Sequence, residues 1–244
     1  RAPFRGRWDI MEKIFAEAEA MILISGKSYL PLKRLMDIVG ALVALLIFSP
    51  LMIRVALRVK RELGSPVVFA QPLPGRSEKI LLIYKFRSMR HAVDASGRPL
   101  PDRERLTPFG RRLRRSSLDE LPELWNVLKG DMSLVGPRPL LVDFLPLFGE
   151  EEARRHSVRP GLTGLAQVSG RNAMSWEKRL QYDLEYVDRL SLWLDLKILW
   201  RTVAAVLRRD GIDAGEGETV IAPPTEIKRP RALEKIKGAK DRPS

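Results

Sequence analysis

The sequence of 244 residues contains no cysteine and only two histidines. The lack of cysteine excludes disulfides, thiolate metal sites and cysteine nucleophiles. His91 and His156 lie far apart and lack the spacing of metal ligands, so we expect no zinc site. A phosphate-binding P-loop, a dinucleotide-binding glycine motif and a serine–histidine triad are also missing. Chemistry on this chain must therefore come from carboxylates, basic side chains and glycine-rich loops.

Acidic residues are scarce relative to basic ones. The 43 lysines and arginines exceed the 30 aspartates and glutamates, which gives a net charge of +13. Such a charge indicates a polyanionic partner, which is nucleic acid, an anionic lipid surface or a phosphorylated substrate. The 45% hydrophobic content is typical of a folded chain rather than a disordered one.

The chain has one long apolar run, and it is short for a membrane span. Ile38 to Ile53 contains no charge. As a helix it covers roughly 24 Å, whereas a hydrocarbon core is about 30 Å thick. Pro50 cannot donate a hydrogen bond to the Leu46 carbonyl, so we expect a kink, with the Ser49 hydroxyl bonding a freed carbonyl.

Basic residues flank this run on both sides, which places both ends on the cytoplasmic side. They are Lys33, Arg34, Arg54, Arg58, Lys60 and Arg61. Residues 29–61 are therefore predicted to form a re-entrant helix hairpin, with a buried core helix and a spanning helix as alternatives. Asp37 is predicted to lie near the lipid headgroups, paired with Lys33 or Arg34.

The remaining chain predicts an α+β protein with a mainly helical catalytic domain over residues 62–210. Two short strands are expected in "SPVVFAQPLPG" and "KILLIYKFRSM", and a helix capped by Thr107 with Pro108 in its first position. The stretch "VRPGLTGLAQVSGRN" predicts loop or short extended structure. Residues 1–28 form an extension with an amphipathic helix, residues 176–209 form an interfacial or core helix, and residues 211–244 form a basic, disordered tail.

The stretch "RRSSLDELPELWN" contains two adjacent carboxylates, Asp119 and Glu120. Ser117 and Glu120 fit a capping box, which is a purely structural explanation. Proline is tolerated in the first turn of a helix but is damaging beyond it. The position of Pro122 therefore predicts that Asp119 and Glu120 lie just ahead of a helix or within its first turn. Either position faces the electropositive helix end, where phosphate also binds.

Carboxylates beside phosphate require a countercharge. Mg²⁺ held by one or two carboxylates and substrate phosphate is the usual solution, and arginine forks supply more positive charge. Each basic candidate alone is more typical of a solvated surface, and only their joint occurrence favours a site. The candidates are Lys85, Arg87, Arg114, Arg138 and Arg171.

Five segments, in this order, resemble the bacterial sugar transferases known as monotopic phosphoglycosyl transferases. They are "KRLMDIVGALVALLIFSPLMI", "YKFRSM", "RRSSLDELPELWNVLKGDMSLVGPRPLL", "RHSVRPGLTGLAQVSGRN" and "YVDRLSLWLDLKIL". The resemblance covers about residues 29 to 208 and is closest to the small, single-domain form that includes a diacetylbacillosamine phosphate transferase.

The resemblance implies transfer of a sugar 1-phosphate from a UDP-sugar to undecaprenyl phosphate, with release of UMP. It places the protein on the cytoplasmic face of the bacterial inner membrane, at the first membrane step of glycan assembly, ahead of downstream glycosyltransferases. Asp119 corresponds to the nucleophile and Mg²⁺ ligand, and Glu120 to the base or the residue that positions the acceptor. The phosphate or nucleotide contacts correspond to Lys85, Arg87, Arg114, Arg138 and Arg171.

Two alternatives stay open at this point. A membrane-anchored nucleic-acid-binding protein fits the charge, but the sequence lacks a helix-turn-helix or an aromatic RNA-binding signature, so nucleic acid is not the expected partner. A non-catalytic membrane scaffold is the other alternative. The sugar itself cannot be read from these residues.

Overall fold

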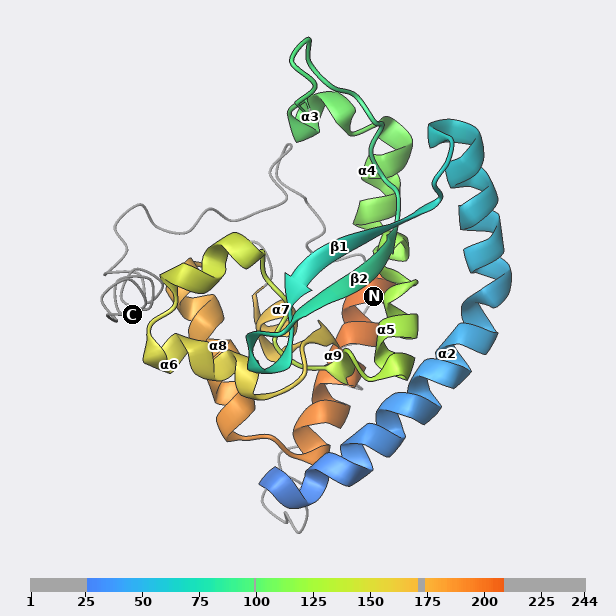
Figure 1. The fold of residues 1–244 in the computed structure, drawn as a ribbon. Coiled ribbons are helices and arrows are strands. Elements are labelled where there is room, and N and C mark those ends of the chain that lie inside the picture. The colour runs from blue at the N-terminus through green and yellow to red at the C-terminus, as the bar shows by residue number, and fades with distance from the viewer. Residues whose placement is uncertain (1–25, 99, 171–173, 209–244) are drawn as a thin grey trace, which may run out of the picture.

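A computed structural model describes residues 26–98, 100–170 and 174–208. The predicted N-terminal amphipathic helix, the C-terminal tail and Arg171 lie outside the described residues. The described chain combines helices with two small sheets, which confirms the α+β class (Figure 1).

The apolar run lies within one continuous helix, α2 (Gly26–Leu63), which spans roughly 57 Å for its 38 residues. Figure 1 shows α2 along one side of the molecule, changing direction near its middle. The Ser49 hydroxyl donates to the Leu46 carbonyl at 2.9 Å, which is the group that Pro50 leaves without its helical donor. The predicted compensation at Ser49 is therefore confirmed.

Much of the apolar surface of α2 is exposed. Its large exposed side chains are Leu35, Val39, Leu42, Val43, Leu46, Ile47, Phe48, Ile53 and Leu57. Among the described helices, this one is long and apolar enough to cross a membrane by length and composition, and only 11% of its most apolar window is buried. A buried core helix is thus the wrong alternative for this segment, and its exposed apolar face indicates membrane association.

Both predicted strands form a hairpin. Strand β1 (Val68–Pro74) pairs antiparallel with β2 (Ile80–Phe86), and η1 (Arg76–Glu78) joins them. Leu73 and Ile83 point inward and pack with Leu124 and Val127 of helix α5 (Glu123–Lys129). This packing fixes the hairpin so that β2 lies beside η2 (Leu118–Glu120), the turn that carries the carboxylate pair.

A second small sheet pairs β3 (Ser133–Val135) parallel with β4 (Gly161–Thr163). The other helices are α3 (Asp102–Arg105), α4 (Pro108–Arg115), α6 (Glu150–Ala153), α7 (Leu165–Ser169), α8 (Trp176–Asp188) and α9 (Leu192–Arg208), with 3-10 turns η3 (Val142–Leu147) and η4 (Arg154–Ser157). The predicted cap of α4 is confirmed, because Thr107 accepts a hydrogen bond from the Gly110 amide at 3.0 Å and Pro108 begins the helix.

Two local predictions need correction. Residues 165–169 form the short helix α7 instead of extended structure, because the glycines of that stretch lie at its ends, at Gly164 and Gly170. The expected long helix over residues 176–209 is two helices, α8 and α9, separated near Leu190. Leu194, Ile198 and Ala204 of α9 are buried, so one face of that helix belongs to the core.

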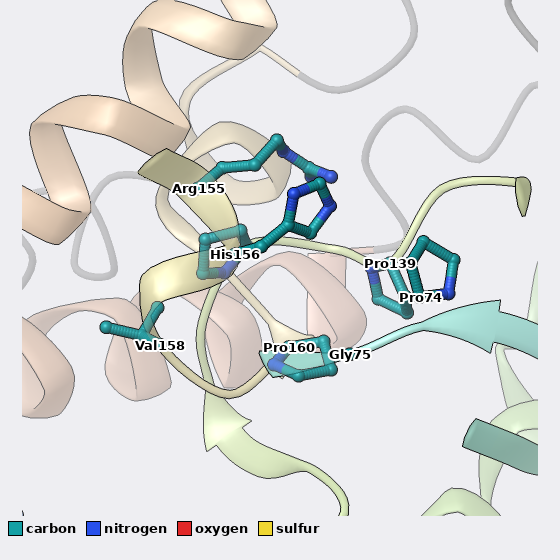
Figure 2. Close-up of a pocket in the computed structure, with 8 residues that line it drawn as sticks. Pro74, Gly75, Pro139, Arg155, His156, Val158 and Pro160 are labelled. Atoms are coloured by element: carbon teal, nitrogen blue, oxygen red, sulfur yellow. The ribbon is translucent and has the colours of Figure 1, made fainter. Parts of the chain in front are cut away.

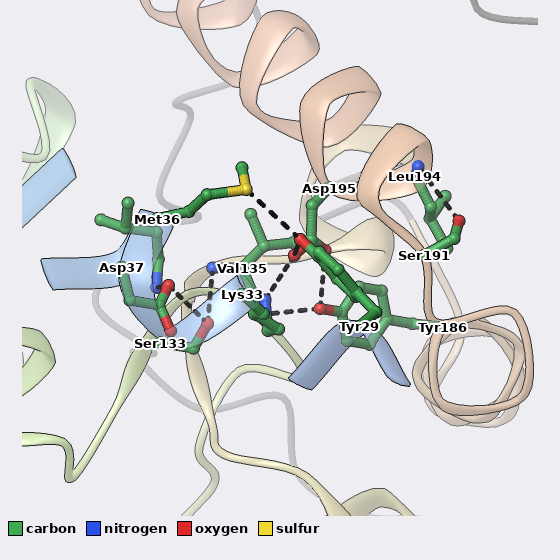
Figure 3. A network of polar contacts seen from close by, with 11 residues as sticks. Tyr29, Lys33, Met36, Asp37, Ser133, Val135, Tyr186, Ser191, Leu194 and Asp195 are labelled. Carbon is green, nitrogen blue, oxygen red and sulfur yellow. Dashed lines mark hydrogen bonds and ion pairs between the residues drawn. The ribbon is translucent and has the colours of Figure 1, made fainter. Parts of the chain in front are cut away.

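A buried polar network attaches the first half of α2 to α9 and β3 (Figure 3). Tyr29 donates to Asp195 at 2.7 Å, and Lys33 forms an ion pair with the same carboxylate. Tyr186 donates to the other Asp195 oxygen at 2.8 Å. Lys33 and Tyr186 also share the Val135 carbonyl, at 2.9 and 3.0 Å. We call Tyr29, Lys33, Val135, Tyr186 and Asp195 the anchor network.

Asp37 is not at the headgroups as predicted. It is only 3% exposed, and its carboxylate accepts from the Ser133 hydroxyl and the Leu134 amide, both at 2.9 Å. The expected cations bond elsewhere, since Lys33 pairs with Asp195 while Arg34 donates to carbonyls in the last turn of α5. The prediction fails because the partners of Asp37 come from a strand about a hundred residues away.

Candidate active site

The carboxylate pair lies on η2, between α4 and α5. Ser117 precedes this turn with a left-handed backbone (φ 54°), and its side chain makes no capping hydrogen bond to a described residue. The capping box is therefore wrong, because the Glu120 side chain turns toward cations instead. Pro122 is the N-terminal cap of α5, which confirms that the pair falls just ahead of that helix.

Glu120 is held by two cations. Arg138 donates hydrogen bonds to both carboxylate oxygens of Glu120, from Nη1 to Oε2 at 3.3 Å and from Nη2 to Oε1. The Lys85 ammonium lies 3.3 Å from Oε1. Burial opposes ionisation, but Arg138 and Lys85 outweigh it and lower the pKa of Glu120 to about 2. Glu120 is thus firmly ionised in the free protein.

Asp119 has the opposite environment. It is only 8% exposed, and no described side chain forms a hydrogen bond or ion pair with its carboxylate. Burial, followed by the adjacent Glu120 charge, raises the pKa of Asp119 to about 6, although Lys85 and Arg114 act against the rise. The site therefore holds one carboxylate whose charge is compensated by two cations, Glu120, beside a buried carboxylate, Asp119, that has no hydrogen-bond or ion-pair partner among the described residues.

A third carboxylate, Glu123, belongs to the site although the sequence did not single it out. It begins α5, is 2% exposed, and lies 3.1 Å from the Lys85 ammonium. Burial and the Glu120 charge raise the pKa of Glu123 to about 7. Its position three residues after Glu120, across Pro122, is the signal that could have identified it, because such a spacing places both side chains on one side of a helical turn.

The predicted basic residues separate into two groups. Lys85 and Arg138 contact the carboxylates directly, and the charge of Arg114 acts on Asp119 while its Nε donates to Ser88 at 2.8 Å. Arg87 instead donates to the carbonyls of Leu63 and Ser65 at the end of α2. The structure thus brings three of the described candidates to the carboxylates and places Arg87 at the helix end.

Arg155 and Asp183 hold the loop that carries Arg138 in place. Arg155 donates to the Arg138 carbonyl at 2.6 Å and forms a buried ion pair with Asp183 at 2.7 Å. A small pocket lies behind the loop, lined by Pro74, Gly75, Pro137, Pro139, Arg155, His156, Val158 and Pro160 (Figure 2). Burial and the Arg155 charge lower the pKa of His156 to about 4, so this imidazole is neutral.

The donor set fits a shared magnesium ion rather than an enclosed metal site. Among the described residues, no group of three or more His, Asp or Glu is arranged to hold a metal. Asp119 offers carboxylate oxygens that no described cation occupies. Mg²⁺ is commonly bound by one or two carboxylates, substrate phosphate and water, so this single carboxylate matches that pattern.

An exposed apolar helix beside a carboxylate–arginine site is typical of a membrane-associated enzyme that acts on a charged group. Residues 28–209 match the model of the bacterial sugar transferase family. The chain belongs to this family and is a transferase.

Several relatives support the assignment. An uncharacterized sugar transferase, EpsL, of Bacillus subtilis is 53% identical over 181 residues, which cover 74% of this chain and 90% of the relative. The UDP-glucose:undecaprenyl-phosphate glucose-1-phosphate transferase of Caulobacter vibrioides is 41% identical over 73% of this chain and 70% of the relative. The undecaprenyl-phosphate galactose phosphotransferase of Salmonella typhimurium is 43% identical over 74% of this chain, but the match spans only 41% of that relative.

Proposed function

We propose that this protein transfers a sugar 1-phosphate from a UDP-sugar to undecaprenyl phosphate and releases UMP. Family membership and the printed activities of the Caulobacter and Salmonella relatives support this reaction. They also favour a transferase over a scaffold or a nucleic-acid-binding protein. The reaction is the first membrane step of lipid-linked glycan assembly, with later glycosyltransferases acting on its product.

The observation that carries the mechanism is the contrast between Asp119 and Glu120. Asp119 is buried, without a described partner, and has a raised pKa, so it is a strong nucleophile once ionised. Its carboxylate oxygen attacks the sugar-linked phosphorus of the UDP-sugar. The bond from that phosphorus to the bridging oxygen breaks, UMP leaves with the electron pair, and a phosphosugar remains on Asp119.

In the second half-reaction an oxygen of undecaprenyl phosphate attacks this phosphorus, and the bond to Asp119 breaks. Glu120 accepts the proton of an acceptor that arrives as the monoanion. In the free protein Glu120 is a weak base, because Arg138 and Lys85 stabilise its charge. Incoming phosphates compete for those cations, which increases the proton affinity of Glu120 when it is needed.

The cations and a magnesium ion would bind the diphosphate. Lys85, Arg114 and Arg138 surround the pair, and Arg171 is proposed from the sequence alone. Asp119 together with the diphosphate would hold Mg²⁺, which offsets the negative charge on the phosphates.

We also propose a re-entrant path for α2 on the cytoplasmic face of the inner membrane. The first half of α2 is held by the anchor network, and its second half packs Val55 and Val59 against Phe86 and Leu113. Both halves thus pack on the same catalytic domain, while exposed apolar residues lie between them. A spanning helix would require one of these contacts to lie across the bilayer.

Anionic lipid is the proposed surface partner. Leu113 faces α2, whereas Arg111, Arg112 and Arg115 on the outer side of α4 are exposed. Guanidinium groups form bidentate hydrogen bonds with phosphate, so these arginines could bind lipid headgroups beside the apolar surface of α2.

A panel of UDP-sugars with Mg²⁺ and undecaprenyl phosphate tests the reaction. At least one sugar should release UMP, and release with none would refute the proposal. When the acceptor is omitted, mass spectrometry should find the phosphosugar on Asp119. An adduct on Glu120 would reverse the two roles.

Cysteine labelling tests the path of α2, because the chain contains no natural cysteine. Ser28→Cys and Ser65→Cys lie near the two ends of the helix and are exposed. In oriented membrane vesicles, an impermeant reagent should label both from the same side. Labelling from opposite sides would show that α2 spans the membrane.

A further inference from the structure

Arg155 connects the loop that carries Arg138 to helix α8. Its Nη2 donates to the Arg138 carbonyl at 2.6 Å, and its Nε and Nη2 donate to Asp183 Oδ2 at 3.0 and 2.7 Å. Arg155 and Asp183 are only 3% and 2% exposed. The loop is therefore fixed against the face of α8 on which Asp183 lies.

Arg179 lies on the same face of α8. It precedes Asp183 by four residues, and side chains at that spacing are neighbours on the surface of a helix. A single guanidinium group, that of Arg155, joins Asp183 to the backbone of Arg138. The fold thus places Arg179 beside the loop of Arg138, although no sequence motif had singled it out.

Positive charge exceeds negative charge at this place. Asp183 already forms an ion pair with Arg155, and Glu120 forms one with Arg138. The half-buried Arg179 has no hydrogen-bond or ion-pair partner of its own among the described residues. Burial lowers the pKa of Arg179, Asp183 opposes this, and the charges of Arg138 and Arg155 add to the lowering. An anion beside Arg179 would remove the imbalance of charge.

We infer that Arg179 is a further substrate-binding residue, which holds a phosphate group together with Arg138. Guanidinium groups form bidentate hydrogen bonds with phosphate, so two of them can share the oxygens of one phosphate group. This phosphate belongs to the donor diphosphate or to the acceptor, because both bring phosphate to the same carboxylates. The inference rests on the proposed transferase reaction and adds a binding residue to it.

Equilibrium binding of UDP tests the donor side without turnover. The full-length protein in lipid nanodiscs is titrated with UDP in the presence of Mg²⁺ and compared with Arg179→Gln. If Arg179 holds a donor phosphate, the Kd for UDP should rise roughly tenfold, because a hydrogen bond from a charged donor is lost. Arg179→Lys keeps the charge but not the bidentate geometry, so its Kd should lie between those of the wild type and Arg179→Gln.

Binding of undecaprenyl phosphate tests the acceptor side, also without turnover. Native mass spectrometry measures the fraction of protein that retains this lipid at increasing lipid concentration. If Arg179 holds the acceptor phosphate, the Kd for undecaprenyl phosphate should rise roughly tenfold in Arg179→Gln, while that for UDP stays unchanged. A weaker affinity for either ligand supports the inference and identifies the phosphate that Arg179 binds.

Lys178→Gln is the matched control, because Lys178 is the preceding residue of α8, carries the same charge and is exposed. Both of its affinities should stay within about twofold of the wild type, and a loss as large as that of Arg179→Gln would overturn the inference in favour of a general effect of net charge.

Unchanged affinities for both ligands in Arg179→Gln would also overturn the inference. If that variant does not fold, Arg179→Lys decides the question, and wild-type affinity for both ligands in the lysine variant would overturn the inference. The proposed reaction fails in a different way, since a wild-type protein that binds UDP but releases UMP from no UDP-sugar would refute the reaction itself.

Discussion

Two buried polar regions of this protein are built from similar residues, yet they differ in how their charges are satisfied. In the anchor network, both oxygens of Asp195 accept hydrogen bonds, and Lys33 and the two tyrosines are all bonded. Around η2, Glu120 is paired with two cations, whereas Asp119 has no described partner and Glu123 shares one lysine.

The difference separates stability from chemistry. A buried ionic group whose hydrogen bonds are complete resists change, and it fixes neighbouring elements relative to each other. A buried carboxylate without a partner destabilises the fold but is available for reaction, which is the usual compromise at active sites. The four predictions below separate these two roles.

The largest expected effect is on activity in Asp119→Asn. Adduct formation and UMP release should fall by roughly 10³-fold or more, because the nucleophile is lost. Stability should change in the opposite direction. Because burial raises the pKa of Asp119, the protonated carboxyl stabilises the fold relative to the ionised one. This contribution to the free energy of unfolding is fully present below about pH 4 and is lost as the pH rises through about 6.

At pH 7.5 the asparagine variant should therefore be more stable than the wild type, by about 1 to 3 kcal/mol. Denaturant unfolding in lipid nanodiscs measures this difference, and the gap should narrow at pH 5. A variant that is both inactive and less stable at pH 7.5 would contradict the proposed origin of the Asp119 pKa.

The anchor network should show the reverse pattern. Asp195→Ala leaves the Lys33 ammonium buried without its carboxylate, which should cost about 3 to 5 kcal/mol of stability. Asp188→Ala is the matched control, since it breaks a surface pair with Arg154 and should cost at most about 1 kcal/mol. A loss of activity per folded molecule as large as that of Asp119→Asn would show that the network does more than hold α2.

Arg138→Lys tests the two-pronged contact with Glu120. Lysine keeps the charge but loses one of the two hydrogen bonds, so the overall rate should fall roughly ten- to a hundredfold. The stability that Glu120 contributes is present above about pH 4.5 and lost as pH falls through about 2. Acid unfolding of this variant should therefore begin at a higher pH, and an unchanged acid profile would show that the lost hydrogen bond does not contribute to the lowered pKa of Glu120.

The smallest effect is expected at the middle of α2. Ser49→Ala removes the hydrogen bond to the Leu46 carbonyl, which should cost about 0.5 to 1.5 kcal/mol in a bilayer. Ser116→Ala is a suitable control, because it removes a similar 2.9 Å bond to Leu113 at a water-exposed helix end. Equal losses in the two variants would indicate that the Leu46 carbonyl does not depend on Ser49.

Local features of the fold were predictable because local chemistry determines them. The Thr107–Pro108 cap and the Ser49 bond each involve residues within four positions of each other, and each strand was predicted from its own short segment. The hydrogen bonds of Asp37 were not predictable, because its donors, Ser133 and Leu134, lie on β3 and no local sequence pattern links them to Asp37.

The same reasoning applies to the site. Asp119 and Glu120 were identified because they are adjacent and precede a proline, and Lys85 and Arg138 because basic residues gather in the same motifs. Contacts with cations separate the roles of these carboxylates, since burial acts on both, and the Lys85 contact depends on the packing of the β1–β2 hairpin against α5. Sequence adjacency could not reveal that Arg138 and Lys85 pair with Glu120 whereas no described cation pairs with Asp119, nor that Lys85 also pairs with Glu123.

The anchor network has a practical consequence for work with this enzyme. Tyr29 and Lys33 belong to the membrane-associated helix, but they complete the hydrogen bonding of Asp195 inside the catalytic domain. A truncation that starts after α2 to obtain a water-soluble domain would expose Asp195, Tyr186 and the apolar core around Ile198. Purification and crystallisation should therefore retain α2 and its surrounding detergent or lipid.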